Sequence, residues 1–255
     1  MAVDAHGTQG SVESGKMIDT IYFDNWNTLV QAPDLMRRGS STEVFHKYLT
    51  EQGIDLPYEM LVEAYVPVAR AQEREAEDAG YREPDYRQRL ETVFHNLEMD
   101  DYVELSYGAW KYYLSLWPVQ TEYFPGVPEM LKELKQGYKL GVITNYMDGP
   151  TCRVVFDKLG FEKVFDSLVV SHELGYMKPA GVLFETAMRE TDSTPSSCVM
   201  VGDTYSADVV GGNRAGMKTV LIDLYDNQQD HYSDCSTVIK NINEFPDALR
   251  RLESS

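Results

Sequence analysis

The chain has 255 residues, 43% of them hydrophobic, and a formal net charge of −18 at pH 7. This length can bury the core of one α/β domain plus a smaller inserted domain, and the composition is that of a globular chain rather than a disordered one. A negative surface repels nucleic acid and anionic membranes, and no apolar run approaches the roughly 20 residues that span a bilayer, so neither partner is expected.

The N-terminal half is predicted to contain a tail, one strand and a run of helices. Residues 1–16 are polar and aperiodic, which predicts a disordered tail or an expression scar. The apolar run over 18–23 predicts a buried strand that ends at Asp24. Residues 33–119 have helical spacing and indicate an inserted helical domain, with helices expected near 44–49, 57–68, 84–97 and 101–117. Pro67 lies within the second helix and is expected to kink or break it.

From Pro125 onwards, predicted strands and helices alternate. Strands are expected over 138–144, 165–170, 198–202 and 218–222, and helices over 127–136, 150–159, 180–189, 206–215 and 243–252. This alternation is typical of βαβ units, so residues 17–32 and 120–255 are predicted to form a Rossmann-like α/β core with a parallel sheet. Ligands of such sheets bind at the carboxyl ends of the strands, which makes the residues that follow each strand the candidates for function.

Carboxylates, a hydroxyl and an ammonium follow these strands and are expected to meet at one edge of the sheet. The residues are Asp24, Thr144, Asn145, Lys178, Asp203 and Asp208. Carboxylates that lie together raise one another's pKa unless a cation neutralises them, and Mg²⁺ suits the position because it takes hard oxygen ligands. One aspartate can then act as a nucleophile, while the metal and the lysine offset charge on the transferring group.

Four motifs in this order resemble those of the haloacid dehalogenase (HAD) superfamily. They are IYFDNWNTL, GVITN, GYMKP and VMVGDTYSADVVGGNRAGM, and the resemblance extends from Ile18 to about Ile222. The position of the helical insertion resembles the C1 cap subclass of that superfamily. The resemblance implies a Rossmann-like HAD core, a helical C1-type cap over residues 33–119, and hydrolysis through an aspartate nucleophile.

The resemblance also implies a role for each site residue. Asp24 would be the nucleophile and a Mg²⁺ ligand, and Asp203 a second ligand. The backbone carbonyl of Trp26 would bind the metal as well. Asp208 would support the water shell of the metal or orient Lys178, which pairs with the nucleophile and the negative charge of the substrate. Thr144 and the backbone amide of Asn145 would bind the transferring group.

Two positions depart from the family pattern. Trp26 stands where phosphatases of the superfamily carry a second aspartate, which protonates the leaving group, and Asn27 stands in place of the following glycine. Loss of a general acid typically lowers the rate by about 10²–10⁴-fold. The side chain of Trp26 either packs beneath the cap or forms a wall of the substrate pocket, and the sequence does not separate these alternatives.

Several activities remain open at this point. A Mg²⁺-dependent phosphatase acting on a small phosphorylated metabolite would need an acidic leaving group or an acid supplied by the cap. A 2-haloacid dehalogenase needs no such acid, but dehalogenases of the superfamily lack the Gly-Asp pair that Gly202 and Asp203 retain, and an unneeded buried carboxylate is costly. A phosphonatase would need a cap lysine, and Lys47 and Lys111 have no supporting pattern. A non-catalytic relative that binds an anion or a partner is the remaining alternative.

Other residues carry weaker signals. Asp148 is a conceivable substitute acid, and His172 follows a strand, where a single histidine is more often structural. Arginines in the cap suit phosphate or carboxylate recognition, although pairing on the helix surface is more usual; they are Arg82, Arg87 and Arg89. The N-terminus has no apolar segment typical of a secretory signal and the three cysteines lack metal-ligand spacing, so we expect a cytoplasmic protein that binds a small anionic substrate.

Overall fold

The structure is a computed structural model that describes residues 18–31 and 41–254. The tail predicted over residues 1–16 lies outside the described residues, as does the first part of the predicted insertion, residues 33–40.

A parallel sheet forms the core, as the sequence predicts, with six strands where five were expected. Its strands are β1 (Thr20–Phe23), β4 (Lys139–Thr144), β5 (Ser167–Val170), β6 (Cys198–Gly202), β7 (Lys218–Ile222) and β8 (Thr237–Ile239). They lie in the order β5-β4-β1-β6-β7-β8, and every neighbouring pair is parallel. The central strand β1 pairs with β4 on one side and β6 on the other, so the segments that follow these three strands emerge side by side.

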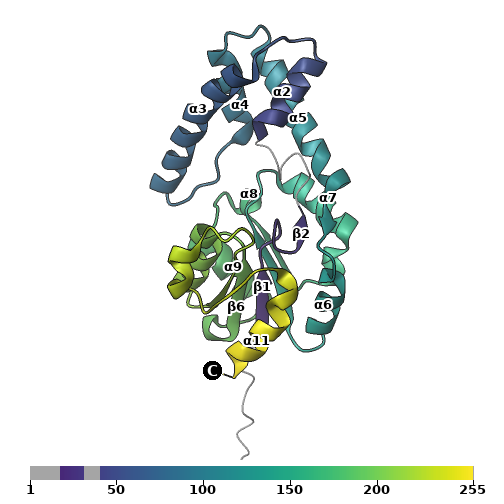
Figure 1. Cartoon of the computed structure of the whole chain (residues 1–255), viewed down its shortest axis with the longest axis vertical. Coiled ribbons are helices and arrows are strands. Elements are labelled where there is room, and N and C mark those ends of the chain that lie inside the picture. The colour runs from purple at the N-terminus through teal and green to yellow at the C-terminus, as the bar shows by residue number, and fades with distance from the viewer. Residues whose placement is uncertain (1–17, 32–40, 255) are drawn as a thin grey trace, which may run out of the picture.

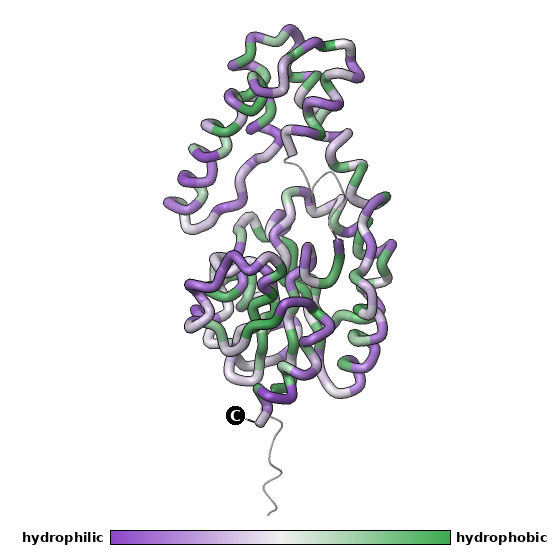
Figure 2. Tube along the Cα trace, viewed as in Figure 1, coloured by the Kyte–Doolittle hydropathy of each residue, from purple (hydrophilic) through white to green (hydrophobic). Residues whose placement is uncertain are grey.

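Helices cover both faces of this sheet (Figure 1). They are α6 (Val127–Leu134), α7 (Gly149–Leu159), α8 (Ser171–Leu174), α9 (Gly181–Thr191), α10 (Val210–Arg214) and α11 (Phe245–Glu253). Successive side chains of a strand point to opposite faces, and accordingly Tyr22 and Phe23 belong to two different apolar clusters. Because both faces are buried, β1 is buried along its whole length rather than on alternate residues, and the strands are mostly hydrophobic in Figure 2.

Four further helices lie together beyond one end of the sheet (Figure 1). They are α2 (Ser41–Glu51), α3 (Tyr58–Asp78), α4 (Tyr86–Asn96) and α5 (Tyr102–Gln120). Of the kink or break expected at Pro67, the break was wrong, because α3 is a single helix that contains this residue. The helix packs against α2 and α4, and this packing compensates for one missing hydrogen bond. Among the described residues, no helix has the length and apolarity needed to cross a membrane.

Short elements that the sequence did not predict join the four-helix part to the core. The two-residue strands β2 (Val30–Gln31) and β3 (Glu122–Tyr123) pair antiparallel where the chain leaves the core and returns to it. A second contact joins the α3–α4 loop to the segment before Lys178: the Glu83 amide donates to the Gly175 carbonyl at 2.9 Å, and the Met177 amide donates to the Tyr81 carbonyl at 2.7 Å. Two-residue strands have no periodicity, which is why no sequence pattern reveals them.

Candidate active site

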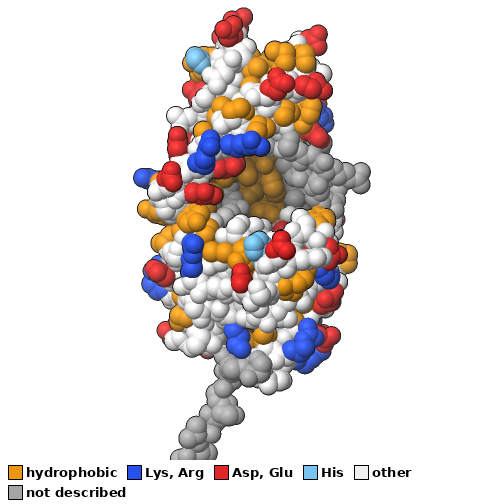
Figure 3. Space-filling model, turned by 60° about the vertical axis from the view of Figure 1, so that its left-hand side comes forward, with side chains coloured by type: hydrophobic (Ala, Val, Ile, Leu, Met, Phe, Trp, Pro, Cys, Tyr) orange, Lys and Arg blue, Asp and Glu red, His pale blue; other side chains and the backbone are white. Residues whose placement is uncertain are grey.

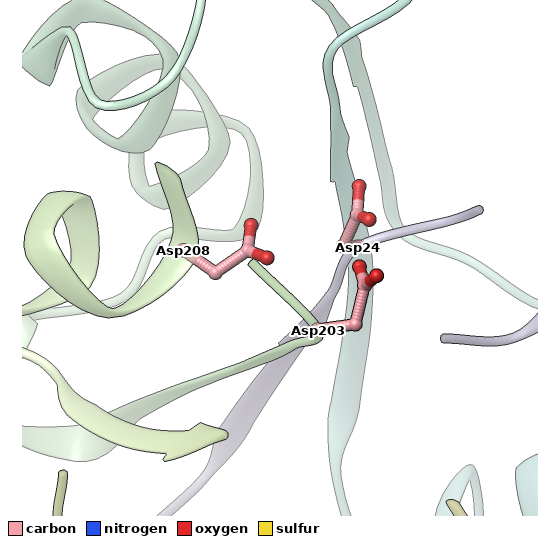
Figure 4. A group of neighbouring side chains, drawn as sticks. All are labelled: Asp24, Asp203 and Asp208. Carbon is pink, nitrogen blue, oxygen red and sulfur yellow. The ribbon is translucent and has the colours of Figure 1, made fainter. Parts of the chain in front are cut away.

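Three carboxylates converge at the carboxyl ends of β1 and β6. Asp24 directly follows β1, Asp203 directly follows β6, and Asp208 lies in the π-helical turn Tyr205–Val209 that precedes α10. Each offers one oxygen, and these oxygens lie within 4.8 Å of one another. Figure 4 shows the three side chains directed toward a common point.

Lys178 is the cation of this cluster. Its side chain is 2% exposed, and its Nζ donates to Asp24 Oδ1 at 2.8 Å and to Asp208 Oδ1 at 2.6 Å. The side chain of Asn145, which follows β4, holds the Lys178 backbone on both sides. Its Oδ1 accepts from the Lys178 amide at 2.7 Å, and its Nδ2 donates to the Lys178 carbonyl at 3.2 Å. This positioning contact of Asn145 is additional to the backbone role expected from the sequence.

With all three aspartates ionised, the cluster carries more negative charge than Lys178 neutralises, because three carboxylates then face one ammonium. Burial, together with the neighbouring Asp24 and Asp208, raises the pKa of Asp203 to about 8. Burial also raises the pKa of Asp208 to about 6, although Lys178 opposes the shift. Burial alone would lower the pKa of Lys178, but Asp208 and Asp24 overcome this and raise it. A set of oxygen donors with excess negative charge fits a hard divalent cation such as Mg²⁺.

Gly202 allows Asp208 to reach the site. A Cβ atom at this glycine would lie 2.1 Å from Asp208 Oδ2, far inside contact distance. That Oδ2 accepts from the Thr204 amide at 3.0 Å, so both oxygens of Asp208 are engaged within the protein. The sequence predicts one helix over 206–215, whereas the structure has a wider π-helical turn before the short α10, and this turn carries Asp208. The geometry suits Asp208 to orienting Lys178.

Thr144 ends β4 beside the carboxylates and is fully buried. Its Oγ1 has no hydrogen-bond partner among the described residues. The Oδ1 and Nδ2 atoms of the Asn25 side chain are also buried and have no partner there. A buried polar atom without a partner costs about 1–3 kcal/mol, so these groups are available to a polar ligand.

Trp26 fills the position of the absent second aspartate. Its side chain is 9% exposed, and its ring centroid lies 4.4 Å from that of Trp117 in α5 and 5.3 Å from that of Tyr146. The indole therefore packs beneath the helical part and offers no acid. Asn27 has φ +57°, which is a left-handed backbone conformation. Asparagine adopts this conformation more readily than most residues, and it can therefore replace the glycine that the family pattern has here.

Comparison with known proteins agrees with this geometry. The family model described as haloacid dehalogenase-like hydrolase matches residues 57–222, more than half of the chain. The chain belongs to this family. The hydrolase is 29% identical over 212 residues to the ribulose-1,5-bisphosphate 5-phosphatase of Halopiger xanaduensis, covering 81% of this chain and 85% of that protein. It is 30% identical over 173 residues to the phosphoglycolate phosphatase of Aquifex aeolicus, covering 63% of this chain and 79% of that protein.

Among solved structures, a 2-haloacid dehalogenase from Pseudomonas syringae pv. tomato DC3000 superposes on this hydrolase with a TM-score of 0.70. The match covers 92% of this chain and 99% of that one at 24% sequence identity. At this identity the likeness establishes the shared fold and leaves the reaction open.

A cleft of about 410 Å³ separates the four-helix part of this hydrolase from its core. Figure 3 shows the hollow, with hydrophobic side chains inside it. Asp148 and the exposed His172 line it, and Asp148 also caps α7 by accepting from the Thr151 amide at 2.9 Å. Lys47 and Lys111 are exposed and are not part of its lining.

Glu83, from the α3–α4 loop, also lines this cleft and was missed by the sequence analysis. Its Oε2 is buried and finds no partner in the part of the chain that the structure describes. Burial raises the pKa of Glu83 to about 7, although a hydrogen bond with Ser171 opposes the shift. The sequence held no specific signal for this residue, because a glutamate before a proline at a helix start looks like an ordinary helix-terminus acid.

Proposed function

We propose that this hydrolase is a Mg²⁺-dependent phosphatase that acts on a small phosphorylated metabolite through Asp24. The observation that carries the proposal is the convergence of Asp24, Asp203 and Asp208 with the buried Lys178. A purely structural cluster would not retain excess buried negative charge. The phosphatase names of the two relatives support the same reaction.

Each group has a defined task in this proposal. Mg²⁺, held by the carboxylates of Asp24 and Asp203 and the carbonyl of Trp26, would neutralise charge on the phosphoryl group. Lys178 binds a phosphoryl oxygen and is itself oriented by Asp208. The Thr144 hydroxyl and the Asn145 amide donate to the remaining oxygens.

The reaction would proceed in two steps. A carboxylate oxygen of Asp24 attacks phosphorus, and the bond between phosphorus and the ester oxygen breaks as that oxygen takes a proton from an acid. Water then attacks the aspartyl phosphate, gives its proton to the same group, and releases inorganic phosphate with Asp24 restored.

Glu83 is the acid that we propose for these proton transfers, in place of the aspartate that Trp26 replaces. The Glu83 carboxyl interacts with Ser171, and the Ser171 hydroxyl accepts from the Tyr146 amide at 2.9 Å. Tyr146 lies two residues after Thr144, so this contact places Glu83 against the loop that follows the proposed phosphoryl site. A carboxyl group with a pKa near 7 can both donate and accept a proton at neutral pH.

Replacing Glu83 with Gln should lower kcat for an alkyl phosphate by about 10²–10⁴-fold. The effect on p-nitrophenyl phosphate should be small, because p-nitrophenolate leaves with little need of a proton. In the unmodified enzyme, kcat for the alkyl ester should fall as pH rises through about 7, since the protonated acid is the active form. Steady-state rates of both substrates between pH 5 and 9 measure this.

The same rates in two variants assign the pH dependence. The same cleft is also lined by Arg87, His172 and Asp148. In Glu83→Gln, the fall in kcat near pH 7 that Glu83 causes should disappear, and any pH dependence due to these other groups should remain. Asp85→Asn is the matched control, because Asp85 lines the cleft while capping α4 through the Gln88 amide, and asparagine caps equally well. An unchanged alkyl phosphatase rate in Glu83→Gln would show that another group supplies the proton.

We also propose that residues 33–119 form a C1-type cap and that residues 17–32 with 120–255 form the core. The antiparallel pair β2 and β3 supports this boundary, because it joins the two chain crossings at Val30–Tyr123 and Gln31–Glu122. The cleft between the two parts then holds the substrate, and movement of the cap would admit it.

Dehalogenation of a 2-haloacid is the second candidate, and Trp26 is the observation that favours it. An aromatic ring packed against Trp117 and Tyr146 stands in place of the acid two residues after Asp24, and halide needs no proton on leaving. The retained Asp203 favours the phosphatase.

Product release with and without metal separates these functions. We expect phosphate release from p-nitrophenyl phosphate that requires Mg²⁺ and stops with EDTA, together with no halide release from 2-chloropropionate. Halide release that EDTA leaves unchanged would establish the dehalogenase instead. Neither product at high enzyme concentration would favour a relative that only binds an anion or a partner.

A further inference from the structure

Arg89 in α4 is a buried cation whose side-chain hydrogen bonds in the described structure go to neutral groups. Its side chain is 6% exposed, although arginine is rarely buried unless paired. Its Nε donates to Gln72 Oε1 at 2.8 Å and its Nη1 donates to the Tyr65 hydroxyl at 3.3 Å, both neutral groups. Among the described residues its ion pair is with Glu73, which is 3.9 Å from Nη1 and 59% exposed, and such a pair contributes little. Within residues 18–31 and 41–254, Nη2 has no partner.

The guanidinium faces a small cavity between the cap and the core. The cavity has a volume of about 110 Å³, and Arg89 is part of its lining. At about 30 Å³ for each water molecule, this space holds roughly three waters, which is enough for a carboxylate or a phosphoryl group. The rings of Tyr86 and Tyr65 lie 4.8 and 5.8 Å from the guanidinium carbon, so the cation is held in an aromatic setting.

This cavity adjoins the substrate cleft. Tyr86, Trp110 and Met147 line both the 110 Å³ cavity and the 410 Å³ cleft. Met147 lies three residues after Thr144, in the loop that follows the proposed phosphoryl site. A molecule with its phosphoryl group at that site and its body in the cleft would have its far end beside the cavity that Arg89 lines.

We propose that Arg89 binds a second anionic group of the substrate, a carboxylate or a phosphate, at the end distant from the phosphoryl group that is transferred. The inference rests on the proposed phosphatase function and names its substrate class: small phosphate esters with two anionic ends. Arginine suits this task because its planar fork binds both oxygens of such a group, and a buried aromatic site strengthens the bond. The positive charge is needed locally, because the protein as a whole carries −18 and repels anions.

A series of linear phosphate esters tests the inference. The esters have two to five carbons and end in a carboxylate, a phosphate or a neutral hydroxyl. For the preferred length, the unmodified enzyme should favour a charged end over the hydroxyl by about 30-fold or more in kcat/KM, and Arg89→Met should remove this preference. The rate on the hydroxyl ester should stay within about twofold in Arg89→Met, because that ester does not use the guanidinium. Comparison of the carboxylate and phosphate series identifies which anion is recognised.

Two variants keep the result interpretable. Arg89→Lys retains the charge and most of the packing, and should recover part of the preference. Arg74→Met in α3 is the matched control, since Arg74 is exposed and lines neither the cleft nor the cavity, and it should leave the preference intact. Equal losses on charged and neutral esters in Arg89→Met would overturn the inference in favour of a structural role, as would a lack of preference in the unmodified enzyme.

A binding measurement separates failure of this inference from failure of the phosphatase function. Titration calorimetry compares phosphonoacetate with ethylphosphonate, which lacks the second anion. Phosphonoacetate should bind about tenfold or more weakly to Arg89→Met than to the unmodified protein, with ethylphosphonate unaffected. If no ester is hydrolysed but this difference is found, the phosphatase proposal fails and the anion site stands. Hydrolysis of p-nitrophenyl phosphate without any such difference would leave the phosphatase and overturn the site.

Discussion

Replacing Asp24 with Asn should abolish turnover, lowering kcat for p-nitrophenyl phosphate by at least about 10⁴-fold at saturating Mg²⁺. An amide oxygen is a far weaker nucleophile than a carboxylate and forms no stable acyl phosphate. The fold should persist, because Oδ1 of asparagine still accepts the hydrogen bond that Lys178 donates to Asp24 at 2.8 Å. Phosphate release measures the rate, and circular dichroism verifies the fold.

Asp19→Asn is the matched control for this substitution. Asp19 lies at the opposite end of the same central strand, directly before β1, and its carboxylate accepts only from the neighbouring Thr20 hydroxyl in the described structure. Turnover should be unchanged in this variant. Turnover of Asp24→Asn within about tenfold of the unmodified enzyme would exclude Asp24 as the nucleophile.

Replacing Lys178 with Met should destabilise the metal-free protein by about 3–5 kcal/mol, because it leaves the buried carboxylates of Asp24 and Asp208 without their cation. Added Mg²⁺ should restore part of this stability, since a divalent cation supplies charge that the lysine no longer supplies. The rate should also fall by at least about 10²-fold, because Lys178 is the proposed ligand of the phosphoryl oxygens. Urea denaturation with EDTA and with Mg²⁺ measures the first two effects.

Lys135→Met provides the control for the loss of an ion pair. Lys135 lies 2.6 Å from Asp166, as close as Lys178 lies to Asp208, but its side chain is 36% exposed and that of Asp166 38% exposed. Water already solvates this surface pair, so its loss should cost about 0–1 kcal/mol, with no response to Mg²⁺. Equal losses in the two variants would mean that the carboxylates around Lys178 are not held as buried ions.

Much of the core could be predicted because its signals are local. A continuous apolar run such as β1 is long enough to indicate a buried strand, and alternation with helices determines that the sheet is parallel. We could then expect Asp24, Thr144 and Asp203 to lie close together, because the carboxyl ends of parallel strands meet at one edge of the sheet. The strands β2, β3 and β8 were missed because two or three residues hold no period.

At Pro67, by contrast, a local sequence signal was present but the tertiary structure overrode it. The local effect of a proline on a helix is unfavourable, and the sequence alone therefore predicts a kink or a break. The structure retains α3 as one helix, since packing against α2 and α4 outweighs one lost hydrogen bond. Propensity is a weak constraint wherever tertiary contacts hold an element on several sides.

The sequence by itself determined the α/β class, the family and the residues gathered at the edge of the sheet, because motifs and periodicity are properties of neighbouring residues. Only the tertiary structure decided how Lys178 is shared by two aspartates, that Trp26 packs against Trp117, and that Glu83 and Arg89 face spaces between the cap and the core. These relations join residues that are distant in the chain, and they depend on how separately formed helices pack. A glutamate or arginine on a surface helix has the same local sequence signal as one buried at a site, and burial is what separates them.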